Sequence, residues 1–140
     1  RGREPVPATP TATANLAPMS TSVLALRGAI TLERDEREHL LERVRRLLTE
    51  MLERNGVEHD DLISILFTAT PDVHSVFPAA AAREMGLGDV PLICAQELDI
   101  VGAMPLCIRV MMHLSTGLRR DELRHVYLEQ ARSLRDDLPE

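Results

Sequence analysis

The chain has 140 residues, with 44% hydrophobic residues, 27% charged residues and a formal net charge of −6 at pH 7. These values are typical of one globular domain, and no apolar run approaches the roughly 20 residues of a membrane-spanning helix. An acidic chain with only 2% aromatic residues lacks the basic stripe or stacking aromatics of a nucleic-acid binder. We therefore expect neither nucleic acid nor membrane among its partners.

All 16 basic residues are arginine. Codon bias alone could produce this pattern, but it has a chemical consequence. A lysine Schiff base and a phosphate-loop lysine are both excluded, so guanidinium groups must hold any anionic ligand. Cys94 and Cys107 form no Cys-x-x-Cys pair and have no histidine at ligand spacing. This predicts two buried thiols in a reducing compartment, a cytoplasmic location and no metal site.

Residues 1–20 are rich in Ala, Thr and Pro and lack apolar periodicity, which predicts a flexible tail. Residues 21–140 are expected to form a single domain. Its first predicted strand, Val23 to Leu26, delivers Arg27 at its end, and Gly28 lets the backbone turn closely there. Arg27 is then either a solvated strand-end charge or part of a site.

A long helix is predicted next, because Asp35 and Glu38 form an Asp-x-x-Glu capping signature. Apolar residues then recur at three- and four-residue spacing until Gly56 stops the pattern. These apolar positions are Leu40, Leu41, Val44, Leu47, Leu48, Met51 and Leu52. The helix is expected to be structural.

A buried strand is predicted over residues 62–69, followed by a Pro-containing turn with His74. His74 has no partner at a spacing that favours a general base. Phe77 and Pro78 then begin a short Ala-rich helix. Its Arg83 is either the partner of a surface ion pair or a ligand contact.

Two further strands flank a loop that contains Glu97 and Asp99. The first, residues 90–94, contains Pro91 and is therefore expected at a sheet edge or at a strand start. The second, residues 106–114, alternates, so that one face is hydrocarbon and should lie on the core. The other face holds Cys107, Arg109, Met111 and His113.

A guanidinium on a half-apolar sheet face is costly unless something anionic meets it. Arg109 is therefore either a surface arginine over an exposed sheet face or part of an anion pocket. Glu97 and Cys94, which lie nearby in the sequence, favour the pocket. The chemistry of such a pocket does not follow from this stretch alone.

Residues 119–123 predict one helical turn, residues 124–128 a last strand, and residues 132–139 an irregular arm. The order of elements predicts an α+β fold with a mixed five-stranded sheet and two helices on one side. The other side would expose Met111 and Cys107 and leave the sheet edges unpaired. A closed homo-oligomer with its sheets facing inward removes both problems.

Five segments occur in a consistent order and spacing. They are Leu-Arg-Gly-Ala-Ile-Thr (26–31), Ala-Thr-Pro-Asp-Val-His-Ser-Val-Phe-Pro-Ala (69–79), Val-Pro-Leu-Ile-Cys-Ala-Gln-Glu-Leu-Asp (90–99), Cys-Ile-Arg-Val-Met-Met (107–112) and Arg-His-Val-Tyr-Leu-Glu (124–129). Together they resemble the monofunctional, non-helical class of chorismate mutase, over roughly residues 24–139. The resemblance implies a homotrimeric pseudo-α/β-barrel with three sites between subunits. It also implies conversion of chorismate to prephenate in aromatic amino-acid biosynthesis.

The resemblance also implies a set of site residues. The catalytic ones are Arg27, Glu97 and Arg109. The substrate-binding ones are Phe77, Ala79, Arg83, Cys94, Tyr127, Leu134 and Arg135. Two positions depart from the family pattern, with Ala80 where relatives often carry a lysine and Ile93 in place of a threonine.

The implied reaction is a one-substrate Claisen rearrangement, which needs no proton transfer, nucleophile, metal or cofactor. The protein has to hold a dianion in its folded conformer and stabilise the charge that separates. Arg109 is expected at the ether oxygen, Arg27 near a substrate carboxylate or the ring substituents, and Glu97 at the ring hydroxyl. Tyr127 would donate to a carboxylate, Cys94 would be a wall, and Arg83 and Arg135 would belong to the entrance or lid.

Two alternatives remain. One is a trimeric imine or enamine deaminase of similar architecture, for which water is a reactant. The other is a catalytically silent trimer that binds a metabolite of the aromatic pathway. Retention of Arg27, Glu97, Arg109 and Tyr127 argues against a decayed site.

Overall fold

A computed structural model describes residues 21–135, without the side chain of Arg135. The predicted tail and the end of the predicted arm lie outside the described residues. The strands are β2 (Ser22–Thr31), β3 (Leu62–Ala69), β4 (Leu92–Gln96), β5 (Cys107–Thr116) and β6 (Val126–Leu128). The helices are α1 (Arg37–Arg54) and α2 (Ala79–Glu84), with short 3-10 helices η2 (His59–Asp61), η3 (Arg120–Glu122) and η4 (Glu129–Arg135).

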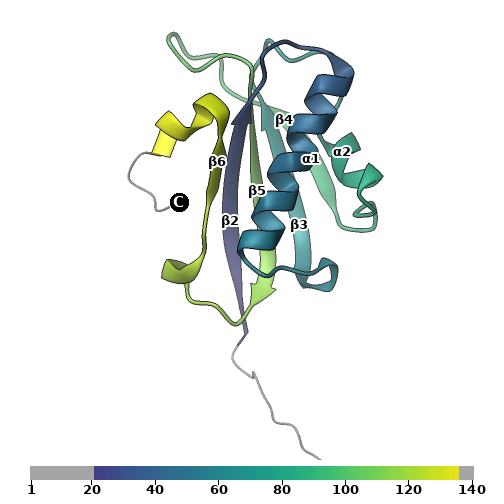
Figure 1. Ribbon diagram of the computed structural model, residues 1–140, viewed down its shortest axis with the longest axis vertical. Coiled ribbons are helices and arrows are strands. Elements are labelled where there is room, and N and C mark those ends of the chain that lie inside the picture. Colours follow the sequence, from purple (N-terminus) through teal and green to yellow (C-terminus); the bar gives the residue numbers. More distant parts are fainter. Residues whose placement is uncertain (1–20, 136–140) are drawn as a thin grey trace, which may run out of the picture.

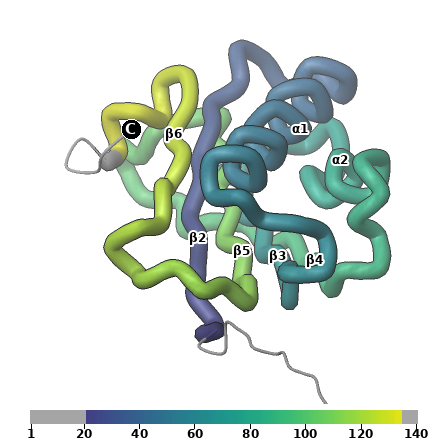
Figure 2. Tube along the Cα trace, turned by 60° about the horizontal axis from the view of Figure 1, so that its bottom comes forward, coloured from purple at the N-terminus to yellow at the C-terminus, as the bar shows by residue number. Residues whose placement is uncertain are grey.

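The five strands form one mixed sheet in the order β4-β3-β5-β2-β6 (Figure 1). β5 lies at the centre and runs antiparallel to β2 and β3, while the outer pairs β3–β4 and β2–β6 are parallel. Both helices cover the same face of the sheet, which Figure 2 shows from a second direction. The predicted α+β fold with a mixed five-stranded sheet is therefore confirmed, and the strand after Pro91 lies at a sheet edge, one of its two expected positions.

The core lies between this sheet face and the apolar stripe of α1. The predicted alternation of β5 is confirmed for Ile108, Val110, Met112 and Leu114, which are all buried, but Cys107, expected to be exposed on the other face, is also fully buried. From α1 the core takes Leu40, Leu41, Val44, Leu47, Leu48 and Met51. One face of the sheet therefore packs against the helices. The side chains on the opposite face, here called the open face, are available for other roles.

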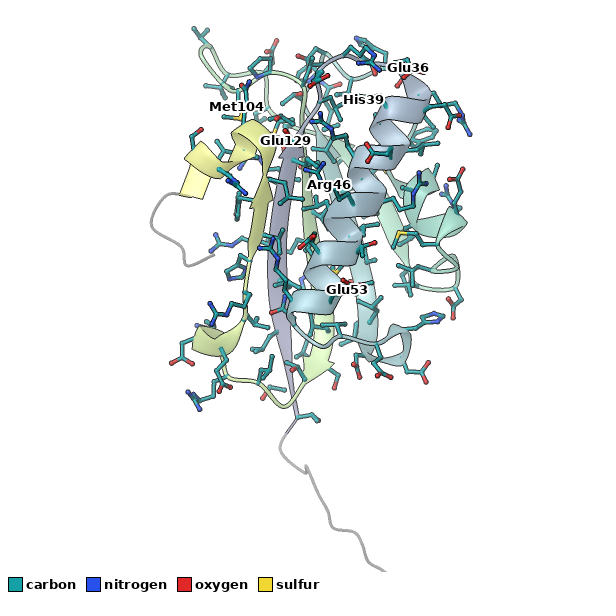
Figure 3. The ribbon with its side chains drawn as sticks, viewed as in Figure 1. Glu36, His39, Arg46, Glu53, Met104 and Glu129 are labelled. Atoms are coloured by element: carbon teal, nitrogen blue, oxygen red, sulfur yellow. The ribbon has the colours of Figure 1, made fainter. Side chains whose placement is uncertain are left out.

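The predicted cap of α1 is off by one residue. The N-cap is Glu36, whose Oε1 accepts a hydrogen bond from the backbone N–H of His39 at 3.0 Å (Figure 3). Asp35 instead accepts from the backbone N–H groups of His74 and Ser75, at 2.7 and 3.1 Å. Asp35 therefore anchors the distant turn before α2, a tertiary contact that competes with local capping.

Gly28 does not make a turn, contrary to the prediction, because β2 continues through it to Thr31. Its hydrogen faces α1: a Cβ at this position would lie 2.4 Å from Sδ of Met51 and 3.2 Å from Cδ1 of Leu47. Glycine is required here for the close approach of the helix to the sheet.

The C-terminal arm is more regular than predicted, since η4 follows β6 directly. Glu129, at φ 57°, begins it, and its Oε2 lies 2.7 Å from Nη2 of Arg46 on α1. Figure 3 labels both residues where the arm meets the helix. The hydrogen bond from Arg46 lowers the pKa of Glu129, and the charge of Arg43 adds to this effect. The arm is thus tied to α1 by charge.

Candidate active site

Three of the predicted site residues share one hollow on the sheet face opposite the helices. Arg27 on β2, Arg109 on β5 and Tyr127 on β6 line a cavity of about 250 Å³. The register explains this, because Ala29 of β2 pairs with both Arg109 and Tyr127. Paired residues point to the same side of a sheet, so the three side chains converge. Gly28, Leu66, Thr68, Val110 and Met111 complete the hollow.

Glu97 supplies the anionic partner of Arg109. It follows β4 directly, and its backbone N–H donates to the carbonyl of Ala69 at 2.9 Å, which extends the ladder by one residue. Its Oε2 lies 3.1 Å from Nε of Arg109. The side chain of Arg109 is 46% exposed and that of Glu97 only 17%. The guanidinium is therefore paired on one edge and open to a ligand on the others.

A second hollow, of about 470 Å³, contains other predicted residues. Cys94 and Phe77 line it together with the turn that precedes α2. Phe77 is 71% exposed, although it is a large apolar residue. The double hydrogen bond from this turn to Asp35 holds the turn in place. Partial burial works to raise the pKa of Asp35, but the hydrogen bonds from Ser75 and His74 outweigh it and lower that pKa.

The two hollows lie on opposite faces of the sheet. Cys94 pairs with Phe67, which is fully buried in the core under the helices, whereas Arg109 pairs with Thr68 on the open face. One protomer therefore brings Arg27, Glu97, Arg109 and Tyr127 together, and it brings Phe77 and Cys94 together, but it does not join the two groups.

The remaining predicted residues line neither hollow. Ala79 is buried in α2 against the core, Arg83 is exposed on the same helix, and Leu134 is half-buried on η4. The side chain of Arg135 lies outside the described residues. Of the two departures from the family pattern, Ala80 is half-buried and Ile93 is exposed.

The two cysteines differ in their surroundings. Cys107 is fully buried, and its burial raises the pKa of the thiol to about 11 despite the opposing charge of Arg109. Cys94 is only half-buried, so the prediction of two buried thiols is correct for Cys107 and wrong for Cys94. Both are free thiols.

Sequence reasoning missed Thr68, whose Oγ1 donates to Oε2 of Glu97 at 2.6 Å. A weak signal was present, since Thr68 is one of two polar residues, with Ser64, in a mainly apolar strand. Its contact with Glu97 depends on the register between β3 and β4 and on the path of the chain after β4, neither of which the sequence reveals.

Within residues 21–135, no three His, Cys, Asp or Glu side chains come close enough to hold a metal ion. In the same part of the chain, no helix combines the length and the apolar character needed to cross a membrane. The hollow on the open face offers guanidinium and hydroxyl groups, and the carboxylate of Glu97 is paired with Arg109.

Two arginines and a tyrosine line one hollow, and a carboxylate is paired with one of the arginines, which is an arrangement suited to binding a small anion. The sequence model of the family described as chorismate mutase type I matches residues 23–138. Chorismate mutase AroH of Bacillus subtilis is 45% identical over 117 residues, which are 83% of this chain and 92% of that protein. Chorismate mutase AroH of Thermus thermophilus is 44% identical over 117 residues, 83% of this chain and 96% of that protein.

A solved structure gives the same result for the fold. The chorismate mutase from Clostridium thermocellum superposes with a TM-score of 0.77 at 44% identity, covering 79% of this chain and 98% of that one. The chain belongs to the type I chorismate mutase family. It is accordingly an enzyme of the isomerase class, and the resemblance seen in its five segments is confirmed.

Proposed function

We propose that three copies of this chain form a ring and that chorismate is converted to prephenate at sites between neighbouring subunits. The family membership supports the reaction. The division of the site residues between two sheet faces supports the position of the site. In this arrangement the open face of one protomer, with Arg109, meets the hollow of the next, with Cys94 and Phe77. The working unit is the single domain 21–140, acting in cytoplasmic aromatic amino-acid biosynthesis.

Exposed apolar side chains support a ring as well. Large ones outside the core are Val23, Ile63, Phe77, Ile93, Leu98, Ile100 and Val101. Three of them lie in the loop that follows β4 and Glu97. Apolar groups concentrated in this way mark association surfaces, and a closed homo-oligomer buries them without leaving an open edge.

The reaction breaks a C–O bond while a C–C bond forms, and negative charge grows on the departing oxygen. In our proposal Arg109 donates to this ether oxygen through its N–H groups that face away from Glu97. The contact is strongest where the charge is greatest, which is the condition for lowering the barrier. The pairing of Nε with Glu97 at 3.1 Å fixes the guanidinium before substrate arrives, so that little reorganisation is needed.

The other groups hold and shape the substrate. Arg27 and Tyr127, in the same hollow as Arg109, bind a carboxylate of the dianion. Glu97 meets the ring hydroxyl, where its charge favours the positive character of the cyclohexadienyl fragment. Holding the side chain of the substrate over its ring brings the two reacting carbon atoms close together, which lowers the entropic part of the barrier.

Residues outside that hollow close the pocket. Phe77 and Cys94 of the neighbouring protomer form an apolar wall, in which Cys94 is a packing and hydrogen-bonding group and not a nucleophile. Ala79 shapes this wall from α2. The arm, with Leu134 and Arg135, and the helix residue Arg83 lie at the entrance and affect binding more than the chemical step.

The single observation that carries this proposal is that Arg109, which is paired with Glu97, lines one hollow together with Arg27 and Tyr127. The test is to incubate the protein with chorismate and follow the loss of its ultraviolet absorbance, with sedimentation velocity on the same sample. We expect enzymatic loss of chorismate, formation of prephenate and the mass of a trimer. Unchanged chorismate together with hydrolysis of an imine would instead favour the deaminase.

A further inference from the structure

Thr68 faces the same hollow as Arg109. Its side chain also contacts the carboxylate of Glu97, which is paired with Arg109. The two residues are direct partners in the register of β3 and β5, and both line the hollow on the open face. Thr68 Oγ1 donates to Glu97 Oε2 at 2.6 Å. A hydrogen bond of this length to a charged acceptor is at the strong end of its range.

Both contacts of the Glu97 carboxylate with described side chains fall on the same oxygen. Oε2 accepts from Thr68 at 2.6 Å and lies 3.1 Å from Nε of Arg109. A carboxylate has two oxygens and about four acceptor positions. Oε2 takes both the hydrogen bond from Thr68 and the ion-pair contact with Arg109, so Oε1 remains available as an acceptor for a ligand.

Without the Thr68 hydroxyl, the Glu97 carboxylate could adopt a more favourable contact with Arg109. A guanidinium and a carboxylate prefer the bidentate arrangement with two parallel N–H···O bonds. Rotation of the Glu97 side chain into that arrangement would engage a further N–H of Arg109 and occupy Oε1. Only the backbone of Glu97 is fixed by the sheet, through its bond to Ala69, so the side chain needs a second restraint.

We propose that Thr68 is a positioning residue of this enzyme. Its hydroxyl holds Glu97 in a one-oxygen contact with Arg109, which keeps Oε1 directed at the substrate hydroxyl and keeps the outer N–H groups of Arg109 free for the ether oxygen. This inference rests on the proposed roles of Arg109 and Glu97. It predicts an effect on the chemical step, because Arg27 and Tyr127, which bind the substrate carboxylate, do not contact Thr68 in the described hydrogen bonds.

The experiment compares Thr68→Val with Thr68→Ser in the full chain, by steady-state turnover of chorismate. Valine keeps the shape and removes the hydroxyl, and serine keeps the hydroxyl. Loss of one hydrogen bond to a charged group corresponds to about a tenfold change. We expect kcat to fall about tenfold in Thr68→Val with KM changed by less than about twofold, and Thr68→Ser to recover most of the lost kcat. If Thr68→Val fails to fold, Thr68→Ala is measured in its place.

Ser64→Ala is the matched control, since it removes a hydroxyl from the same face of β3 where the partner is His113 at 3.2 Å and not Glu97. It should leave kcat near that of the unmodified enzyme. The second test repeats Thr68→Val in a Glu97→Ala background, where the expected effect on kcat shrinks below about twofold because the group that Thr68 positions is gone. A Thr68 effect of unchanged size in that background would overturn the inference.

The outcomes separate this inference from the proposed function. An unmodified protein that leaves chorismate untouched refutes the function and with it this inference. An active enzyme whose kcat is unaffected by Thr68→Val refutes the inference alone. A fall in both Thr68→Val and Ser64→Ala of equal size also refutes it, because the cause would then be the strand and not the contact with Glu97.

Discussion

Cys94 and Arg109 lie on opposite faces of the same sheet. Cys94 pairs with the buried Phe67, and Arg109 pairs with Thr68 on the open face. A substrate that contacts both side chains must therefore lie between two protomers. The first prediction below depends on this relationship.

Mixing two inactive variants should restore activity. Arg109→Ala removes the guanidinium from the open face, and Cys94→Trp blocks the other hollow by bulk. In rings formed from equal amounts of the two variants, each half of a site has a probability of about one half of being intact. About a quarter of the sites should therefore be complete. The measurement is chorismate turnover after joint refolding of the two variants.

The control for this experiment combines Arg109→Ala with Arg27→Ala, which both lie in the open-face hollow. Every site in such a mixed ring takes its open face from a defective chain, so no activity should return. Equal recovery in both mixtures, or no recovery in either, would contradict a site shared between protomers.

Gly28→Ala should destabilise the fold, since its Cβ would lie 2.4 Å from Sδ of Met51. Overpacking of this kind typically costs about 1–3 kcal/mol in the free energy of unfolding. Gly117→Ala is the matched control, because nothing lies within 4 Å of its added Cβ. Urea unfolding at fixed protomer concentration measures both, and equal stability of the two variants would show that the helix is not packed against Gly28.

The two thiols should react at different rates. The pKa of Cys107 is raised to about 11 by burial, so near neutral pH it carries almost no thiolate, which is the reactive form. We expect alkylation of the native protein, followed by mass spectrometry, to modify Cys94 first and Cys107 only in denaturant. Preferential modification of Cys107 would contradict the described packing. Incubation with chorismate should give no covalent adduct at Cys94.

The Arg46–Glu129 contact should make stability depend on pH. The pKa of Glu129 is lowered in the folded chain, so the contact stabilises the fold above the usual carboxyl pKa and the stabilisation is lost as the pH falls through the lowered value. Because the pair is partly exposed, its contribution is below about 1 kcal/mol. Glu129→Gln should therefore be less stable than the unmodified chain at about pH 7, and this difference, measured by chemical unfolding, should disappear as the pH falls through the lowered pKa of Glu129. A difference that persists at the lower pH would assign the effect to something other than this charge.

Much of the fold could be predicted because the spacing of the apolar residues matches the face that each element turns toward the core. The stripe of α1 and the alternation of β5 each encode which side faces the core, and the Pro91 segment shows an edge. The cap at Asp35 and the role of Gly28 could not be predicted, since each depends on a partner far along the chain: the turn at His74 for Asp35, and Met51 for Gly28. Local sequence rules assign such residues local roles.

For the candidate site, the sequence identified the residue types and the structure supplied their grouping. The alternation of β5 placed Arg109 on the open face, and the loop placed Glu97 near it. The assignment of Cys94 to the other face required the register between β3 and β4. Thr68 was missed because its importance lies in a side-chain contact across that register.

The central claim is that the guanidinium of Arg109 lowers the barrier by stabilising charge on the departing oxygen. The most direct test is the turnover of chorismate by Arg109→Ala and Arg109→Lys, with the ring and the thermal unfolding of each variant checked. We predict a fall in kcat of about 10²–10³ or more for alanine and only partial recovery for lysine, which lacks the planar fork. Near-normal turnover by a folded, trimeric Arg109→Ala variant would contradict the claim.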